Sequence, residues 1–150
     1  IPYDNNIKIG IMIETPAAVI ISESLAKECD FFSIGSNDLT QYTLAADRTN
    51  ELVTDAYNSF HPAVLKMICM TIKSAKKAFI PVSICGELAS HSAATQFLIG
   101  MGIDELSVPA PVLLELKNII FKINYQDSVE LVKELMKLNS TYEILQCLEN

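Results

Sequence analysis

Short apolar segments alternate with longer amphipathic segments along the whole chain. Residues 7–13 (IKIGIMI) are almost continuously apolar, which is typical of a strand buried on both faces in a parallel sheet. Three more apolar runs, at 31–34, 81–84 and 105–108, are long enough for strands and too short for helices. The pattern therefore predicts four strands, each followed by a segment with helical spacing.

Helices are predicted between these strands from apolar positions three and four residues apart. The first should run from Pro16 to about Glu28, with Thr15 as its N-cap. Residues 39–60 are mixed and predict a short helix followed by the polar loop 47–50. The remaining helices are expected from His61-Pro62 to about Lys77, over 90–100 with Ser90 as cap, from Pro111 to about Ile123, and over 127–138 and 141–148.

The strand–helix alternation, repeated four times, predicts an α/β fold with a parallel sheet and right-handed crossovers. Two architectures fit: a small open α/β sheet, or the last half of a TIM (β/α)8 barrel, which as a whole needs about 250 residues. The chain starts at Ile1 with neither an initiator Met nor a signal-peptide pattern, as expected of a segment cut from a longer protein. This favours the half barrel. We expect residues 1–150 to be a fragment of a single domain, namely the last four β/α units of a TIM barrel with extra C-terminal helices.

Charge and composition narrow the classes of partner. The net charge of -7 argues against nucleic acid and against an anionic membrane surface. No apolar run reaches the roughly 18 uncharged residues of a membrane span. Half of the residues are apolar and none of the four cysteines stands in a CxxC pair, so we expect reduced thiols in a cytoplasmic protein.

Polar side chains follow three of the predicted strands at the points where the strands end. Glu14 follows the first strand, Asn37 and Asp38 follow the second, and Cys85 ends the third. Because the carboxyl ends of parallel strands meet at one rim, these side chains should converge. Two carboxylates with neighbouring amide and hydroxyl oxygens suit Mg²⁺. Arg48, in the polar loop, can bind phosphate oxygens, and Cys85 can act as a nucleophile or as an acid and base.

Each of these residues also has a simpler interpretation. Glu14 can merely complement the dipole of the next helix, and Asn37 or Asp38 can be a helix cap. Arg48 can pair with a nearby aspartate, and Cys85 can be an inert buried thiol. The other candidates are interpreted as structural, namely His61 and His91 at helix starts and Met67, Met70 and Met101 as core residues.

Five blocks carry a family resemblance, and they are Gly10–Ala18 (GIMIETPAA), Asp30–Tyr42 (DFFSIGSNDLTQY), Ala46–Asn50 (ADRTN), His61–Val64 (HPAV) and Cys85–Ala89 (CGELA). In this order they resemble the C-terminal half of the phosphoenolpyruvate-binding barrel of enzyme I, the phosphoenolpyruvate–protein phosphotransferase of the bacterial sugar phosphotransferase system. Pyruvate phosphate dikinase and phosphoenolpyruvate synthase share the Glu, Asn-Asp and Cys-Gly positions. The stretches 41–48 and 85–89 look like enzyme I rather than those relatives.

The resemblance implies transfer of the phosphoryl group of phosphoenolpyruvate to a histidine of the same enzyme, then to a histidine phosphocarrier protein, with release of pyruvate. It implies Mg²⁺ at Glu14 and Asp38, substrate at Asn37, Asp38 and Arg48, and Cys85 as the proton donor to the enolate. It also implies a homodimer. The two alternatives are a dikinase or synthase barrel and a non-catalytic dimerisation module.

The resemblance also marks what this chain lacks. The first four barrel strands and the N-terminal phosphohistidine domain, through which the phosphocarrier protein would act, are not in this sequence. The chain alone should therefore be inactive, and its unpaired sheet edges should cause self-association or marginal stability. Ser36 stands where many relatives have Thr, which is a mild change.

Overall fold

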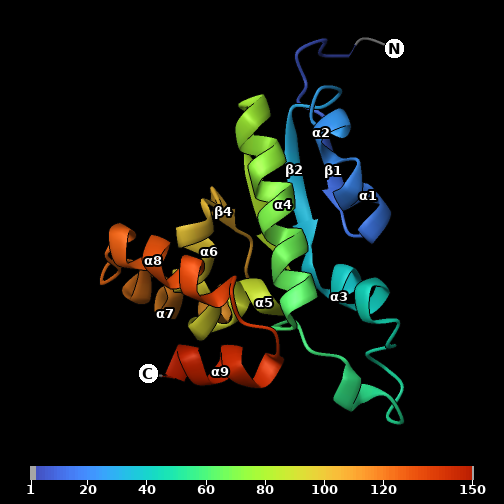
Figure 1. The fold of residues 1–150 in the computed structure, drawn as a ribbon. Coiled ribbons are helices and arrows are strands. Elements are labelled where there is room, and N and C mark those ends of the chain that lie inside the picture. The colour runs from blue at the N-terminus through green and yellow to red at the C-terminus, as the bar shows by residue number, and fades with distance from the viewer. Residues whose placement is uncertain (1–2, 150) are drawn as a thin grey trace.

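A four-stranded parallel sheet forms the centre of the computed structural model, which describes residues 3–149 (Figure 1). Strands β1 (Gly10–Ile13), β2 (Phe31–Gly35), β3 (Val82–Cys85) and β4 (Glu105–Leu106) lie side by side in sequence order. Gly10 pairs with Phe31, Phe32 with Val82, and Ser83 with Glu105. The predicted α/β fold with a parallel sheet is confirmed.

Two strands are shorter than predicted. Residues 7–9 precede the sheet, and the side chains of Ile7 and Ile9 are about two-thirds exposed. Asp30 holds this segment instead, because it accepts hydrogen bonds from the Ile9 N–H and from Lys8 Nζ, both at 2.9 Å. β4 has two residues rather than four, although beyond it the Ser107 N–H still donates to the Ile84 carbonyl at 2.9 Å.

The first helical segment is divided in two. Thr15 is the N-cap of α1 (Pro16–Ile20), as predicted, and its Oγ1 accepts from the Ala18 N–H at 3.2 Å. The helix stops at Ile21 (φ -99°, ψ 11°), and α2 (Ser22–Leu25) follows. Next to this break, Ser22 Oγ lies 2.7 Å from Ser74 Oγ in a buried contact. The prediction of one continuous helix to Glu28 was wrong.

The remaining helices follow the predicted order with shifted starts. α3 (Ser36–Leu44) begins directly at the end of β2, and a short 3₁₀ turn, η1 (Thr54–Ala56), interrupts the loop before α4 (Pro62–Ala78). Ser90 is no cap, because it ends α5 (Glu87–Ser90), and α6 (Ser92–Met101) starts after His91. The chain finishes with α7 (Ala110–Ile120), α8 (Tyr125–Leu135) and α9 (Thr141–Glu149).

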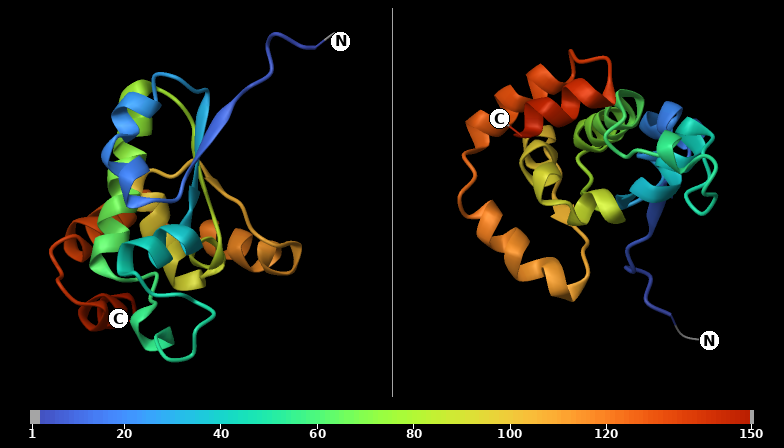
Figure 2. Two further views of the ribbon diagram at one scale, coloured as in Figure 1. Left: turned by 90° about the vertical axis from the view of Figure 1, so that its right-hand side faces the viewer. Right: turned by 90° about the horizontal axis from the view of Figure 1, so that it is seen from below.

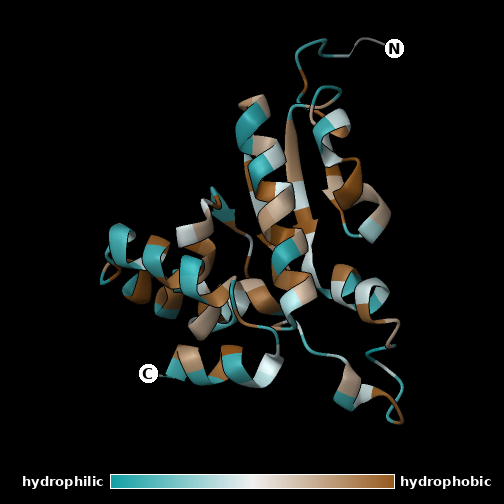
Figure 3. Cartoon of the chain, viewed as in Figure 1, coloured by the Kyte–Doolittle hydropathy of each residue, from teal (hydrophilic) through white to brown (hydrophobic). Residues whose placement is uncertain are grey.

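The main core lies between the sheet and one layer of helices. Figure 2 shows α1, α2 and α4 on the same side of the strands, and the alternate strand residues that face them are fully buried. These residues are Ile13, Phe32, Ile34, Val82 and Ile84. α6 packs against α8. Figure 3 shows that the strands are mainly hydrophobic, whereas α9 has both hydrophobic and hydrophilic residues. Burying such apolar faces is the main force that stabilises the layers.

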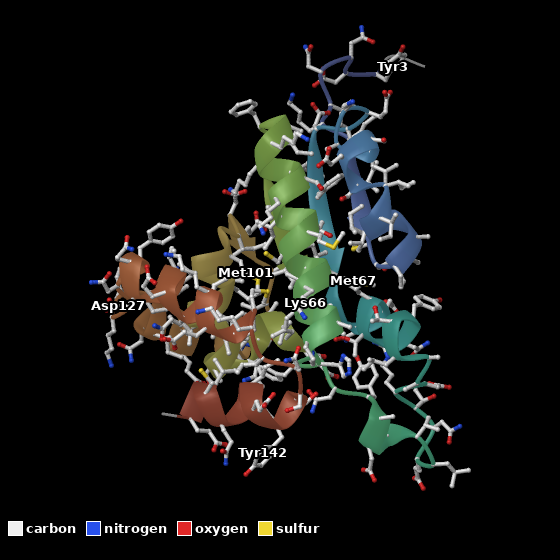
Figure 4. All side chains as sticks on the ribbon, in the orientation of Figure 1. Tyr3, Lys66, Met67, Met101, Asp127 and Tyr142 are labelled. Atoms are coloured by element: carbon white, nitrogen blue, oxygen red, sulfur yellow. The ribbon has the colours of Figure 1, made fainter. Side chains whose placement is uncertain are left out.

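Two of the three methionines assigned to the core pack against it. Met67 on α4 and Met101 at the end of α6, both labelled in Figure 4, are partly buried against the core. Thr43 Oγ1 also donates to Met67 Sδ at 3.3 Å. Met70 is 44% exposed, so its assignment to the core was wrong. No helix within residues 3–149 combines the length and the apolar character that crossing a membrane requires.

Candidate active site at the carboxyl ends of the strands

A cavity of about 230 Å³ lies where β1, β2 and β3 end. It is lined by Met12, Glu14, Gly35, Ser36, Asn37, Asp38, Arg48, Cys85 and Gly86. Every site residue predicted from the sequence therefore borders one cavity, although these residues come from three strand ends and a loop. Figure 1 shows α3 and α5, which follow β2 and β3, beside each other at this end of the sheet.

Strand register brings Glu14 and Cys85 to the same level. Ile13 pairs with Ile34 and Gly35 pairs with Cys85, so Glu14, Gly35 and Cys85 form one row across three strands. Gly35 leaves room for the Glu14 side chain, because a Cβ atom at Gly35 would lie 2.9 Å from Glu14 Oε2. The glycine thus lets the carboxylate lie across the sheet toward β3.

The stretch that follows β2 forms the first turn of α3. Ser36, Asn37 and Asp38 are its first three residues, and no side chain caps the helix. Asn37 Oδ1 instead accepts from the Glu87 N–H at 3.0 Å, so the interpretation of Asn37 as a cap was wrong. The first N–H groups of a helix have no partners within it, and together with the helix dipole they favour an anion.

Cys85 is a half-buried free thiol whose backbone is tied to α3. Its Sγ donates to the Ile34 carbonyl at 3.5 Å, and its own carbonyl accepts from Ser36 Oγ at 2.6 Å. Gly86 follows with φ 93° and ψ -172°, a backbone conformation that is essentially restricted to glycine. Cys85 is therefore not fully buried, and it lines the cavity.

Arg48 is exposed, and no ion pair within residues 3–149 joins it to Asp47 or Asp55. Asp47 instead accepts from the N–H and the Oγ1 of Thr49, both at 2.8 Å, and these bonds hold its pKa below the usual range. The Arg48 backbone N–H donates to Gln41 Oε1 at 3.4 Å. Arg48 therefore forms no ion pair with either aspartate, and it is one of the residues that border the cavity.

Tyr57 does not line this cavity but contacts Asn37, which does, and the sequence did not predict this contact. Its hydroxyl donates to the Asn37 carbonyl at 3.2 Å, which ties the loop after α3 to the first turn of α3. Burial raises the pKa of Tyr57, and the charge of Glu87 adds to this, whereas Ser59 and Arg48 act in the opposite direction. Tyr57 is thus a neutral hydrogen-bond donor at physiological pH. A single tyrosine in a mixed segment carries no local signal that would have identified it.

The two histidines lie at helix starts, as predicted. His61 is the N-cap of α4, and its Nδ1 accepts from the Ala63 N–H at 3.2 Å. His91 precedes α6, and its ring lies edge-on to Phe60 at a centroid distance of 4.9 Å. His91 also borders a second cavity of about 640 Å³, which meets the first at Asn37 and Gly86. The site is therefore open on the side of β4.

The donor set of the cavity has the chemistry for a hard cation. Within residues 3–149, no three His, Cys, Asp or Glu side chains gather into a group that could hold a metal by themselves. Glu14 and Asp38 nevertheless border the same cavity and supply two carboxylates. Mg²⁺ usually takes one or two protein carboxylates and completes its shell with water and substrate oxygens, so these residues fit it.

These features define an α/β domain with a polar cavity at the carboxyl ends of its parallel strands, which is where such folds usually place their ligand sites. Residues 1–125 match the family described as PEP-utilising enzyme, PEP-binding domain, where PEP is phosphoenolpyruvate, and the chain belongs to this family. The family resemblance read from the sequence is confirmed.

Relatives named phosphoenolpyruvate-protein phosphotransferase match nearly the whole chain. The protein of Buchnera aphidicola subsp. Acyrthosiphon pisum is 49% identical over 100% of this chain and 26% of its own length. That of Haemophilus influenzae is 45% identical over 98% of this chain and 26% of its own length. That of Bacillus subtilis is 39% identical over 94% of this chain and 25% of its own length. The chain spans about a quarter of the length of these relatives.

Proposed function

We propose that this chain is part of a longer enzyme that transfers the phosphoryl group of phosphoenolpyruvate to one of its own histidines and releases pyruvate. The observation that carries the proposal is the shared cavity, where Glu14, Asn37, Asp38, Arg48 and Cys85 meet. The names of the relatives support the same reaction. The histidine would then pass the group to a phosphocarrier protein through an N-terminal domain, in the first step of sugar uptake.

Residues 1–150 would form the last four β/α units of a TIM barrel. Strands in sequence order, all parallel, support this arrangement, as does the arc of helices in the right-hand view of Figure 2. On the face away from α4, Met12 and Phe31 are 47% and 37% exposed, and a closed barrel would cover them. The chain would be inactive alone, and the whole enzyme would be a homodimer. Its free cysteines agree with a cytoplasmic location.

Substrate binding would use the first turn of α3 and the loop behind it. The uncapped N–H groups of this turn would donate to the phosphate or carboxylate oxygens, with the Asn37 amide nitrogen as a further donor. Arg48 would bind the phosphate by its two-pronged guanidinium. Glu14 and Asp38 would hold Mg²⁺, which when bound neutralises charge on the phosphate and the enolate oxygen. Phosphoryl transfer depends mainly on such positioning and charge neutralisation.

Cys85 would complete the reaction by protonating carbon. When the P–O bond of phosphoenolpyruvate breaks, the phosphoryl group moves to the histidine. The electron pair of the broken bond remains on the enolate oxygen. The Cys85 thiol then gives its proton to C3 of the enolate, which forms the methyl group of pyruvate, and the thiolate regains a proton from water. An ordinary thiol is a workable acid near neutral pH.

A label-transfer experiment tests this function. The full-length protein is incubated with phosphoenolpyruvate labelled in its phosphate, with Mg²⁺ and without nucleotide, in the presence and absence of a histidine phosphocarrier protein. The proposal predicts label on a histidine of the enzyme and then on the carrier. Label that instead reaches AMP, once nucleotide and phosphate are supplied, would indicate a dikinase or synthase. A protein that takes up no label would be a non-catalytic module.

A further inference from the structure

Two hydrogen bonds join the start of α3 to the turn that carries Cys85. Ser36 is fully buried, and its Oγ donates to the Cys85 carbonyl at 2.6 Å. Asn37 Oδ1 accepts from the Glu87 N–H at 3.0 Å. The two bonds hold the backbone on either side of Gly86. Ser36 is itself held in place, because its carbonyl accepts from Thr40 Oγ1 at 2.7 Å.

The Cys85 thiol depends on this anchoring for its direction. Its own hydrogen bond to the Ile34 carbonyl is long, at 3.5 Å, and a thiol is a weak donor. Cys85 is the last residue of β3, and Gly86 after it adds no side chain that would restrict the peptide between them. The Ser36 hydroxyl fixes the carbonyl of that peptide and thereby the backbone from which the thiol projects.

We infer that Ser36 is a positioning residue whose hydroxyl holds the Cys85 backbone so that the thiol faces the carbon that it protonates. The inference rests on the proposed function, in which Cys85 serves a three-carbon enolate. Ser36 borders the cavity, but its hydroxyl donates to the Cys85 carbonyl rather than into the cavity. It acts through the Cys85 carbonyl, so its loss should slow the proton transfer and leave ligand binding largely unchanged.

The proton transfer can be measured alone, because it runs in reverse with pyruvate. The Cys85 thiolate removes a proton from the pyruvate methyl group, the thiol exchanges with D2O, and deuterium returns to carbon, which NMR detects. Binding is measured separately by calorimetry with oxalate, a planar mimic of the enolate. In the full-length protein with Mg²⁺, Ser36→Ala should slow the exchange at least about tenfold, because small misplacements of a reacting group have large effects on rate.

The matching variants separate positioning from general damage. Ser36→Thr keeps the hydroxyl and should exchange within about threefold of wild type, with oxalate affinity within about threefold in every variant. Ser74→Ala removes another buried serine hydroxyl, the one 2.7 Å from Ser22 Oγ, and should leave the exchange unchanged. If Ser36→Ala does not fold, Ser36→Cys replaces it, because a thiol has nearly the same size and is a weaker donor.

The outcomes are distinct. If Ser36→Ala exchanges at the wild-type rate, the inference about Ser36 is overturned, whereas the proposed function is not affected. An equal loss of exchange and of oxalate affinity would also overturn it, because Ser36 would then support the whole site. A wild-type protein that made pyruvate from phosphoenolpyruvate with no exchange would overturn the role of Cys85 on which the inference rests. No pyruvate formation at all would overturn the proposed function.

Discussion

Gly86→Ala is the single substitution that should disturb the candidate site most directly. Gly86 has φ 93° and ψ -172°, and a Cβ atom there would overlap Ser36 Oγ and lie 2.8 Å from Asn37 Oδ1. The added methyl group would therefore collide with Ser36 and Asn37, the two side chains that hold the turn at residues 85–87 (the Cys85 turn). These atoms cannot move away without breaking their hydrogen bonds to the Cys85 carbonyl and the Glu87 N–H.

The size of the effect follows from these contacts. A non-glycine residue in this backbone region costs about 1–3 kcal/mol. Each of the two hydrogen bonds contributes about 0.5–1.5 kcal/mol. The strain together with the loss of both hydrogen bonds amounts to roughly 2–6 kcal/mol, which is divided between stability and activity. Because about 1.4 kcal/mol corresponds to a tenfold change in rate, we expect pyruvate formation to fall by at least about tenfold.

Gly102→Ala is the matched control. Gly102 also has φ 93°, but it caps α6 and does not line the cavity, and a Cβ there would meet only Lys76 and Ile72 side-chain atoms at 3.6 and 3.9 Å. It should cost about 1–2 kcal/mol of stability for the left-handed conformation alone. Its activity should stay normal at temperatures where the protein is folded.

The assay couples pyruvate release from phosphoenolpyruvate to lactate dehydrogenase in the full-length protein, with Mg²⁺ and the phosphocarrier protein present. Denaturant unfolding of the same samples gives the change in the free energy of unfolding. If Gly86→Ala has normal activity and loses no more stability than Gly102→Ala, the contacts between α3 and the Cys85 turn do not hold the site, and the argument from Gly86 is refuted.

Three further predictions concern other residues. Glu14→Gln keeps the shape of the side chain and removes its charge, so the Mg²⁺ concentration for half-maximal activity should rise at least about tenfold; an unchanged Mg²⁺ dependence would contradict the metal assignment. Tyr57→Phe removes the bond to the Asn37 carbonyl and should lower kcat/KM about two- to tenfold, with normal thermal unfolding; unchanged steady-state kinetics would show that Tyr57 has no part in the site. The pKa of Asp30 is held low by the Ile9 N–H and by Lys8, so Asp30 stabilises the fold above its unfolded-state pKa near about 3.9, and the stabilisation is lost as the pH falls through the lowered pKa. Asp30→Asn should therefore be less stable than wild type in urea unfolding at pH 7 and equal to it in strong acid, and a gap that persists in acid would refute this.

The sequence predicted those elements whose signals are local. Thr15 before Pro16, and His61 before Pro62, marked two helix starts, and short apolar runs marked the strands. The break at Ile21 and the start of α3 at Ser36 had no such signal. Ser, Asn and Asp are favoured as helix caps. In this chain Ser36, Asn37 and Asp38 instead form the first turn of α3, and Asn37 accepts from the Glu87 N–H, fifty positions away along the chain.

The candidate site was predictable as a group and not in its internal contacts. The rule that parallel strands present their carboxyl ends at one rim was sufficient to bring Glu14, Asp38 and Cys85 together. Tyr57 was missed because it contacts a backbone carbonyl, which any sequence supplies. The bond from Ser36 to Cys85 depends on the register of β2 and β3, which apolar periodicity does not define for short, nearly continuous apolar runs.

The most direct test of the account is the substitution Cys85→Ala in the full-length protein. Pyruvate formation from phosphoenolpyruvate is measured beside Mg²⁺-dependent binding of oxalate, with Cys147→Ala, another half-buried free thiol, as control. The account predicts that Cys85→Ala forms almost no pyruvate and binds oxalate nearly as wild type, while Cys147→Ala is normal in both. Normal turnover by Cys85→Ala, or loss of oxalate binding, would contradict the role of Cys85 as the proton donor of this site.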